Sequence, residues 1–274
     1  MSNLSYAALR AWHAYFHVGY AQFFIRGPQG SGKTTYAMIS MYQLYRRLGF
    51  DKEEAWRIVV EMTVFKPAPA LDLMEFMLEL QELHASKGEK AAFEEAVRHE
   101  QGWWITKLAR LATRRKPELK YRVWRVPVIL FDDAGLYFSK YLTSLGSEGY
   151  WTAMRVNALI NLIRTMASCT IFTSPDLDVL KELRKKSWIV SEPFIPHGEN
   201  KPHRIMRHYK KRLLPSGQIV TKRVKREDVY RVDVLPDWVY DEYERKRREA
   251  LRWLLSLMRK YPTPTEQQIT LAGE

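Results

Sequence analysis

The segment Gly27–Thr34 has the residue types and spacing that phosphate binding needs. It reads GPQGSGKT and fits the pattern G-x-x-x-x-G-K-[ST] at every fixed position. Glycines let the backbone approach a ligand closely, so that its N–H groups can surround phosphate oxygens. Lys33 would reach the β- and γ-phosphates, and the Thr34 hydroxyl would bind Mg²⁺. We therefore predict ATP and Mg²⁺ as ligands. The predicted nucleotide-binding residues are Gly27, Pro28, Gln29, Gly30, Ser31, Gly32, Lys33, Thr34 and Thr35.

Two adjacent carboxylates, Asp132 and Asp133, follow the apolar run 128–131. A continuous apolar run is typical of a strand buried on both faces of a parallel sheet, and ligands bind at the carboxyl ends of such strands. Asp132 is therefore predicted to hold Mg²⁺ together with Thr34. Asp133 is predicted to act as the general base that polarises the attacking water. The alternative is that both aspartates only cap the chain end of the strand.

A second apolar run, at 169–173, ends in Thr173 and Ser174. A hydroxyl at this position could hydrogen-bond the γ-phosphate or the attacking water, and so report whether ATP or ADP is bound. We assign this sensor role to Thr173, with Ser174 as the alternative. The alternative is that Thr173 only ends the strand and has no role in nucleotide binding.

The surrounding sequence predicts the elements that position these residues. An apolar run precedes the phosphate loop and helical periodicity follows it, which is the context that the motif requires. Asp51 and Glu54 have capping-box spacing, although the β-branched residues after them favour a strand as the rival interpretation. Predicted helices are 4–17, 33–48, 52–65, 71–84, 154–167, 177–186 and 238–261. Predicted strands are 23–25, 128–131, 169–173, 188–190, 204–213, 218–225 and 229–234, with a linker at 193–200.

Composition limits the classes of protein that fit. The chain has 274 residues, a formal net charge of +13 and one cysteine, Cys169, which excludes an internal disulfide. No apolar run approaches the ~18 residues that span a bilayer, and the first residues do not resemble a signal peptide. We therefore expect a cytoplasmic protein. The positive charge favours a polyanionic partner, nucleic acid before an anionic membrane.

Two segments concentrate this charge. Residues 103–126 carry eight basic residues and one acidic residue, and 201–260 carry 18 basic and eight acidic residues. A basic hairpin around 214–217 could track a phosphate backbone or enter a major groove. We predict DNA as the partner of both patches, although a solvated helix and a charge-protected sheet edge are the respective alternatives.

Taken together, the phosphate loop, the Asp-Asp strand and the hydroxyl-ended strand resemble the additional-strand group of P-loop ATPases, which includes AAA+ and RecA-like proteins. The Asp-Asp-Ala-Gly version at 132–135 is similar to ATPases of archaeal viruses and plasmids. The resemblance covers about residues 20–192. It implies Walker A and Walker B roles for Lys33, Thr34 and Asp132. The group usually has Glu where this chain has Asp133, which places the carboxylate about 1.5 Å further back. Slow hydrolysis is therefore one implied outcome.

We expect a three-layer α/β fold with a mostly parallel sheet. The ATPase domain is predicted at 1–192, with a helical insertion at 85–125 and a basic hairpin-helix appendage at 193–274. Arg155, Arg164 and Arg184 are candidate arginine fingers, and the group's oligomeric members make a homo-oligomer a further expectation. The predicted function is ATP-dependent action on DNA, in replication initiation or helicase loading, packaging or partition. The alternatives are a small-molecule kinase and a non-catalytic, ATP-switched assembly protein.

Overall fold

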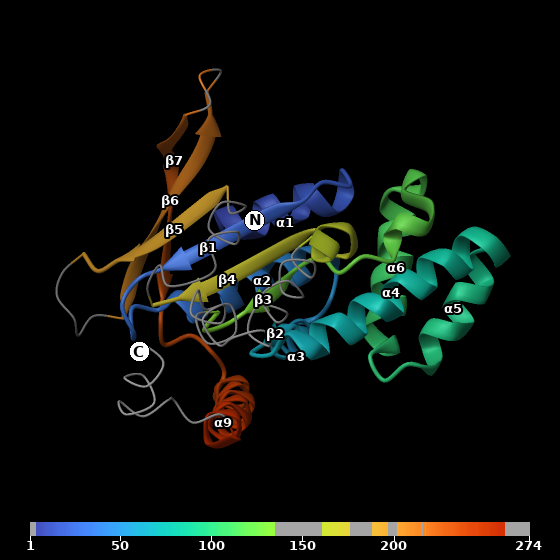
Figure 1. Cartoon of the computed structure of the whole chain (residues 1–274). Helices are drawn as coiled ribbons and strands as arrows, with labels where there is room; N and C mark the ends of the chain where they lie inside the picture. Colours follow the sequence, from blue (N-terminus) through green and yellow to red (C-terminus); the bar gives the residue numbers. More distant parts are fainter. Residues whose placement is uncertain are drawn as a thin grey trace, which may run out of the picture.

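A seven-stranded sheet with the order β2-β3-β4-β1-β5-β6-β7 organises the molecule (Figure 1). This computed structural model describes residues 4–134, 161–175, 188–196, 202–214, 216 and 218–260. The strands β2 to β5 and β1 all run parallel, whereas β6 and β7 are antiparallel to their neighbours. The prediction of a mostly parallel sheet is therefore confirmed. The strands are β1 (Ala21–Arg26), β2 (Thr63–Val64), β3 (Ile129–Phe131), β4 (Cys169–Ser174), β5 (Ile189–Phe194), β6 (His203–Leu213) and β7 (Ile219–Arg231).

The strand order places one extra strand between the two that carry the predicted site. β4 pairs with β1 on one side and with β3 on the other. Both faces of these central strands are buried, and Phe23, Phe24 and Ile25 are at most 1% exposed. Continuous apolar runs are the expected sequence of strands covered on both faces. As a result, β1, β3 and β4 all end at the same edge of the sheet.

Helices begin and end where local capping chemistry predicts. α2 (Lys33–Leu48) starts directly at the phosphate loop and ends at Gly49, whose φ of 116° suits a residue without a side chain. α3 (Lys52–Glu61) has the predicted capping box, in which Asp51 and Glu54 each accept a backbone N–H of the other. The predicted helix 52–65 was too long, because β2 forms at Thr63–Val64, where the β-branched side chains favour a strand.

The predicted insertion is helical, but its first helix begins before the insertion does. α4 (Pro67–Lys87) starts at a proline, because proline fits the first turn of a helix. It replaces the shorter predicted helix 71–84. The remaining elements are α5 (Glu89–Arg98), α6 (Gly102–Arg115) and the 3-10 segment η1 (Pro117–Val123). Trp104 and Trp124 are fully buried among them.

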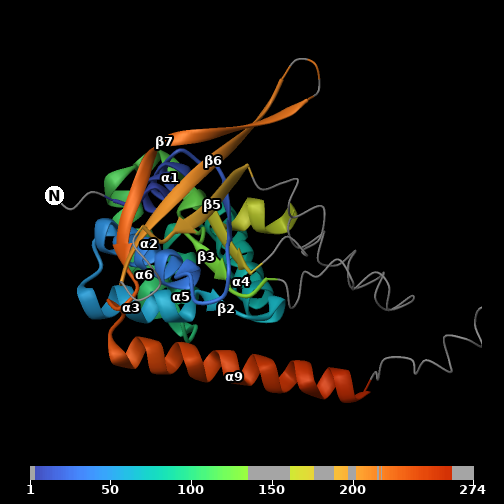
Figure 2. The same cartoon turned by 90° about the vertical axis from the view of Figure 1, so that its left-hand side faces the viewer.

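The chain after β5 extends the sheet. The predicted linker at 193–200 is wrong at its start, because β5 continues to Phe194 and pairs with β6. The boundary at 192/193 therefore falls inside a strand. The two predicted strands 218–225 and 229–234 form the single strand β7, with a register shift opposite Arg207 and Tyr209. Figure 2 shows the far end of the β6–β7 hairpin projecting beyond the rest of the sheet.

The last described element is α9 (Asp237–Lys260), close to the predicted helix 238–261. Figure 2 shows it as one long helix along the lower side of the molecule. α1 (Tyr6–Phe16) packs against α2 and β1. The predicted helix 177–186 and residues 154–160 of the helix 154–167 lie outside the described residues, whereas 161–166 are helical. Among the described helices, none is long and apolar enough to cross a membrane.

Candidate nucleotide-binding site

The phosphate loop joins β1 to α2 and adopts backbone angles that favour glycine. Gly30 and Gly32 have φ of 75° and 89°. A side chain at Gly32 would also collide with β7, because its Cβ would lie 2.6 Å from Val232 and 3.2 Å from the Tyr230 hydroxyl. The N-terminus of α2 follows at once, and helix N-termini favour anions. This loop therefore has both the shape and the electrostatics of a phosphate site.

Lys33 lies at the mouth of this loop. Its Nζ donates to the carbonyl oxygens of Gly27 and Pro28, at 2.7 and 2.8 Å. Burial lowers the pKa of Lys33, although Asp132 and Asp133 oppose that effect. A cation that is already drawn out of water and held by neutral carbonyls is ready to exchange them for phosphate oxygens, because charged hydrogen bonds are stronger than neutral ones.

Three of the predicted residues meet at Asp132. Its Oδ1 accepts the hydroxyls of Thr34 at 2.8 Å and Thr173 at 2.5 Å. Thr34 belongs to α2, Asp132 follows β3 and Thr173 belongs to β4, so the strand order brings them together. Burial, and then the charge of Asp133, raises the pKa of Asp132. This carboxylate is therefore held in one position, and a cation bound beside it would stabilise its charged form.

Asp133 has a strained backbone and a cationic neighbour. Its φ is 49°, a left-handed value that Asp tolerates better than most residues. The backbone N–H of Asp133 donates to the Thr173 hydroxyl at 3.1 Å. Its Oδ2 lies 3.4 Å from Nε of Arg247. Backbone strain of this kind is concentrated at functional sites, where the surrounding bonds maintain it.

Thr173 is a positioning residue in this arrangement. Thr173 is fully buried, and its hydroxyl already bonds both aspartates, by donating to the Asp132 carboxylate and accepting from the backbone N–H of Asp133. Its sensor role stays a prediction. Ser174, which was the alternative, has a buried Oγ without a hydrogen-bond partner among the described residues. Ser174 therefore retains a hydroxyl that a ligand can use.

The chemistry of the site fits the predicted ligands. The Oγ of Ser31, in the phosphate loop, is also buried without a hydrogen-bond partner among the described residues. Buried polar atoms that are left unpaired are costly, so an unpaired hydroxyl within the phosphate loop suits a polar ligand. The oxygen donors of Thr34 and Asp132 are of the kind that Mg²⁺ uses beside substrate phosphates. No group of three or more His, Cys, Asp or Glu side chains that could hold a metal ion by themselves occurs in the described part of the chain, so a metal here would rely on Thr34, Asp132 and the phosphates.

The sequence analysis missed the contribution of α9 to this site. The Tyr243 hydroxyl donates to Asp132 Oδ2 at 2.8 Å, and Arg247 follows one helical turn later. Lys246 anchors the helix, because its Nζ donates to Val60 O at 2.6 Å and to Thr63 O at 2.9 Å. Tyr240, Tyr243 and Arg247 have the spacing of one helical face. That spacing was readable in the sequence, whereas the surface it covers was not.

The sequence analysis also missed the contribution of β7. The Tyr230 hydroxyl donates to the Gly32 carbonyl at 3.1 Å. Two residues earlier, Asp228 Oδ2 accepts the Tyr36 hydroxyl of α2 at 2.6 Å and lies 3.1 Å from His208 Nε2 of β6. The root of the hairpin is therefore bonded directly to the phosphate loop and to the helix behind it.

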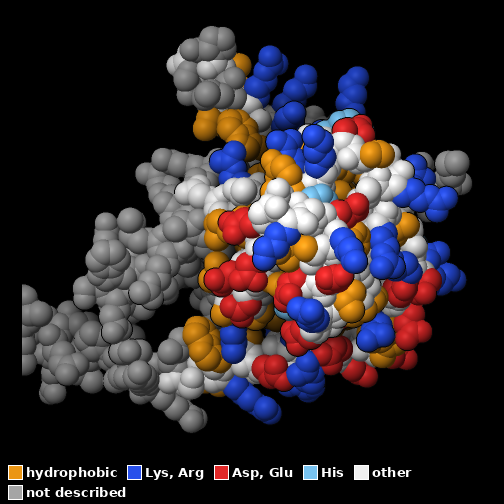
Figure 3. All heavy atoms as spheres, turned by 90° about the vertical axis from the view of Figure 1, so that its right-hand side faces the viewer, with side chains coloured by type: hydrophobic (Ala, Val, Ile, Leu, Met, Phe, Trp, Pro, Cys, Tyr) orange, Lys and Arg blue, Asp and Glu red, His pale blue; other side chains and the backbone are white. Residues whose placement is uncertain are grey.

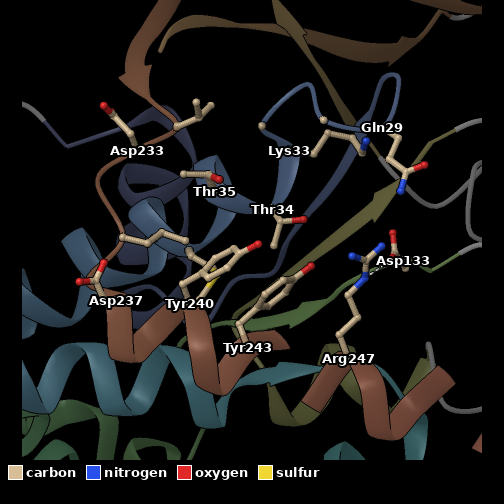
Figure 4. A pocket seen from close by; sticks show the side chains of 15 residues that line it. Gln29, Lys33, Thr34, Thr35, Asp133, Asp233, Asp237, Tyr240, Tyr243 and Arg247 are labelled. Carbon is tan, nitrogen blue, oxygen red and sulfur yellow. Dashed lines mark ion pairs between the residues drawn. The ribbon is translucent and has the colours of Figure 1, made fainter. Parts of the chain in front are cut away.

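These elements enclose a cavity of about 610 Å³. Its lining combines the phosphate loop and α2 with residues that precede or belong to α9 (Figure 4). The lining residues are Gln29, Gly30, Gly32, Lys33, Thr34, Thr35, Met38, Asp133, Val232, Asp233, Leu235, Asp237, Tyr240, Tyr243 and Arg247. A volume of this size suits a small molecule.

The arginines proposed from the sequence do not enter this site. Arg164 lies over the Tyr20 ring, next to the start of β1 and therefore at the opposite end of that strand from the phosphate loop. Arg155 and Arg184 lie outside the described residues. Arg247 is the arginine that lines the cavity. Hydrolysis was also expected to switch the loop at 135–149, which lies outside the described residues.

The two basic patches differ in how their charges are used. In 103–126, Lys107 pairs with Glu54, Arg115 lies over Trp12, and the buried Arg125 donates to backbone carbonyls. Figure 3 shows basic and acidic side chains interspersed over the α4–α6 side, with Lys and Arg gathered at the upper rim where the hairpin projects. Of the two patches, the hairpin therefore has the more concentrated positive charge.

The fold and the site together resemble those of the additional-strand group of P-loop ATPases. The two carboxylates follow β3, and β4 lies between β3 and β1, the strand that leads into the phosphate loop. This agrees with the resemblance found in the sequence.

Comparison with known proteins gives distant similarities. No protein-family model matches the chain. "Uncharacterized protein B-251" of Sulfolobus spindle-shape virus 1 is 28% identical over 239 residues, which are 84% of this chain and 74% of that protein. Among solved structures, the pCW3 conjugation coupling protein TcpA with ATPgS is similar at a TM-score of 0.38 and 11% identity. That match covers 81% of this chain but only 65% of TcpA. The KaiC-like protein PH0186 of Pyrococcus horikoshii OT3 gives a TM-score of 0.31 and 16% identity, over 74% of this chain and 89% of that one.

Proposed function

We propose that this protein binds and hydrolyses ATP with Mg²⁺ and acts on DNA through its β6–β7 hairpin. The observation that carries the ATPase part is the meeting of Thr34, Asp132 and Thr173 beside the phosphate loop. A mere glycine-rich turn would not need a buried carboxylate fixed to the first turn of the helix after it.

The residues have separate tasks in this proposal. The loop N–H groups and Lys33 bind the phosphates, and Thr34 and Asp132 hold the metal, which supplies charge neutralisation when bound. Asp133 accepts the proton of the attacking water. The water oxygen bonds to the γ-phosphorus as the bond to the bridging oxygen breaks, so that ADP and phosphate leave. Ser174, or Thr173 after rearrangement, senses the γ-phosphate.

The DNA part rests on charge that has no partner within the described residues. Lys210 lies directly opposite Lys222 in the hairpin register, and both side chains are exposed. Like charges directly opposite each other destabilise a hairpin, so their presence supports a polyanionic partner. The proposal covers replication initiation or helicase loading, packaging and partition, and it includes assembly into a homo-oligomer.

A non-catalytic ATP switch is the second candidate, and one observation favours it. Asp133 has the shorter side chain and faces Arg247 at 3.4 Å. If that ion pair persists with ATP bound, the carboxylate cannot serve as a base. A small-molecule kinase is less well supported, because the described lining of the cavity contains one arginine, Arg247, and no cluster of arginines to hold a second phosphate-accepting substrate.

ATP turnover and ATP affinity, measured with and without single- and double-stranded DNA, test the proposal. The Lys33→Ala variant should lose ATP binding, whereas Asp133→Asn should bind ATP and stop turnover. Wild-type binding without turnover, unchanged by Asp133→Asn, would favour the switch. Unchanged ATP affinity in Lys33→Ala would reject the site itself.

A further inference from the structure

The cavity beside the phosphate loop has two ends of different chemistry. In Figure 4, Gln29, Asp133 and Arg247 lie toward one end, and Thr35, Asp233, Asp237 and Tyr240 lie toward the other. The first end holds the residues assigned to the terminal phosphates and the metal. The second end is formed by the segment 232–240, which links β7 to α9.

The second end is unsuited to phosphate. Asp237 adds negative charge, which repels a triphosphate, whereas the charge of Asp233 is offset by Arg231, and neither aspartate belongs to the metal-binding group around Asp132. Carboxylates in a cavity are good acceptors for neutral donors such as hydroxyl and amino groups. The part of the ligand at this end must therefore be uncharged and rich in hydrogen-bond donors.

The same end offers apolar and aromatic surface. Met38 is fully buried, and Val232 and Leu235 pack against the core. Tyr240, in contrast, leaves 53% of its surface exposed although it lines the cavity. An exposed aromatic ring beside aliphatic side chains is a suitable surface for a flat ring to stack on.

From this arrangement we propose that 232–240 forms the nucleoside half of the nucleotide site, with Tyr240 against the base. The inference rests on the proposed function and extends it to the recognition of the base and ribose. Asp233 is paired with Arg231 at 2.6 Å, whereas Asp237 makes no ion pair with a described residue. Asp237 therefore accepts a hydrogen bond from the ribose hydroxyls or the exocyclic amine of a purine ribonucleotide. Thr35, which lies toward this end next to Thr34, would contact the innermost phosphate.

Inorganic tripolyphosphate separates the two halves of the site, because it carries the phosphates without the nucleoside. Equilibrium affinities for ATP and for tripolyphosphate, both with Mg²⁺, should be measured for the full chain and its variants. Tyr240→Ala should weaken ATP about ten-fold, as expected for one lost stacking contact. Asp237→Asn should also weaken ATP, and tripolyphosphate affinity should not change in either variant.

The matched controls are Trp238→Ala and Asp241→Asn, which change exposed neighbours outside the cavity lining. Both should bind ATP as the wild type does. Equal affinity of the wild type for ATP and tripolyphosphate would overturn the inference, as would equal weakening of both ligands by Tyr240→Ala. Lys33→Ala should weaken both ligands, so a failure of the phosphate loop gives a different pattern from a failure of the nucleoside half.

Discussion

Replacement of four basic side chains in the β6–β7 hairpin should remove most of the salt-dependent DNA affinity. These side chains are exposed and form no ion pair with a described acidic residue, unlike Arg207 and Arg223, which both pair with Glu227. The four are Lys210, Arg212, Lys222 and Lys225. Each would be changed to Gln, which keeps the length and polarity of the side chain close to the original.

The structure sets the expected size of the effect. Each phosphate that a protein neutralises makes the slope of log affinity against log salt more negative by about 0.9 for B-DNA. Loss of four contacts should therefore reduce the magnitude of the slope by about 3.6. Between 50 and 200 mM salt, that difference corresponds to roughly 150-fold in affinity.

Fluorescence anisotropy with a labelled duplex, across a salt series, measures both slopes. The control carries four Gln replacements with the same change in net charge on the side of the molecule that holds α3 to α5, away from the hairpin (Figure 1). The control positions are Lys52, Lys87, Lys90 and Arg98. Circular dichroism should show that both variants remain folded, because all eight positions are exposed.

The comparison refutes the reasoning if both variants lose the same amount of slope. Net charge alone would then explain the binding, and the hairpin would have no special place in it. An unchanged slope in the hairpin variant would mean that DNA, if it binds, contacts a different surface.

Three further predictions concern the elements that hold the site. Asp228→Asn should lower the free energy of unfolding by about 3 kcal/mol in chemical denaturation, because buried donors from Tyr36 and His208 lose a charged acceptor. Burial alone would raise the pKa of Asp228, but these hydrogen bonds outweigh it and hold the pKa below its usual value. The stabilisation should therefore be complete above about pH 4 and decline as pH falls below it, with no such decline in the variant. Burial lowers the pKa of Lys246 from 10.5 to about 8. Between these two pH values, Lys246 is protonated in the unfolded chain but largely neutral in the folded protein. Wild-type stability should rise relative to Lys246→Met across that range, by up to about 3 kcal/mol, and parallel pH profiles would contradict this. Arg247→Ala should reduce ATP turnover about 10³-fold while ADP still binds, if the guanidinium stabilises transferred charge; the exposed neighbour Arg248, changed to Ala, should have no effect.

The sequence determined the chemical parts of the site and the elements that carry them. The phosphate loop, its strand and its helix were readable because glycine positions and apolar periodicity are local properties. The pair Asp132 and Asp133 could be assigned to the same edge of the sheet because parallel strands present their carboxyl ends together. Capping at Asp51 and the end of α2 at Gly49 also follow from neighbouring residues.

Errors occurred where tertiary contacts override local preference. After Glu61 the sequence left helix and strand both open, and pairing with β3 draws Thr63 and Val64 into the sheet. Likewise, Pro193 suggested a linker, although it belongs to β5 and pairs with Met206 of the antiparallel strand β6. Pairing partners that lie far away in the chain leave no local signal.

The completion of the site was decided by the tertiary structure alone. Tyr243 reaches Asp132 across 111 residues of sequence, and Tyr230 reaches Gly32 across 198. Neither residue belongs to a motif, since a tyrosine hydroxyl can serve many roles. A sequence motif identifies only those site residues that lie close together in the chain. The return of β7 and α9 over the phosphate loop depends on how the whole sheet is ordered, and only the folded chain contains that information.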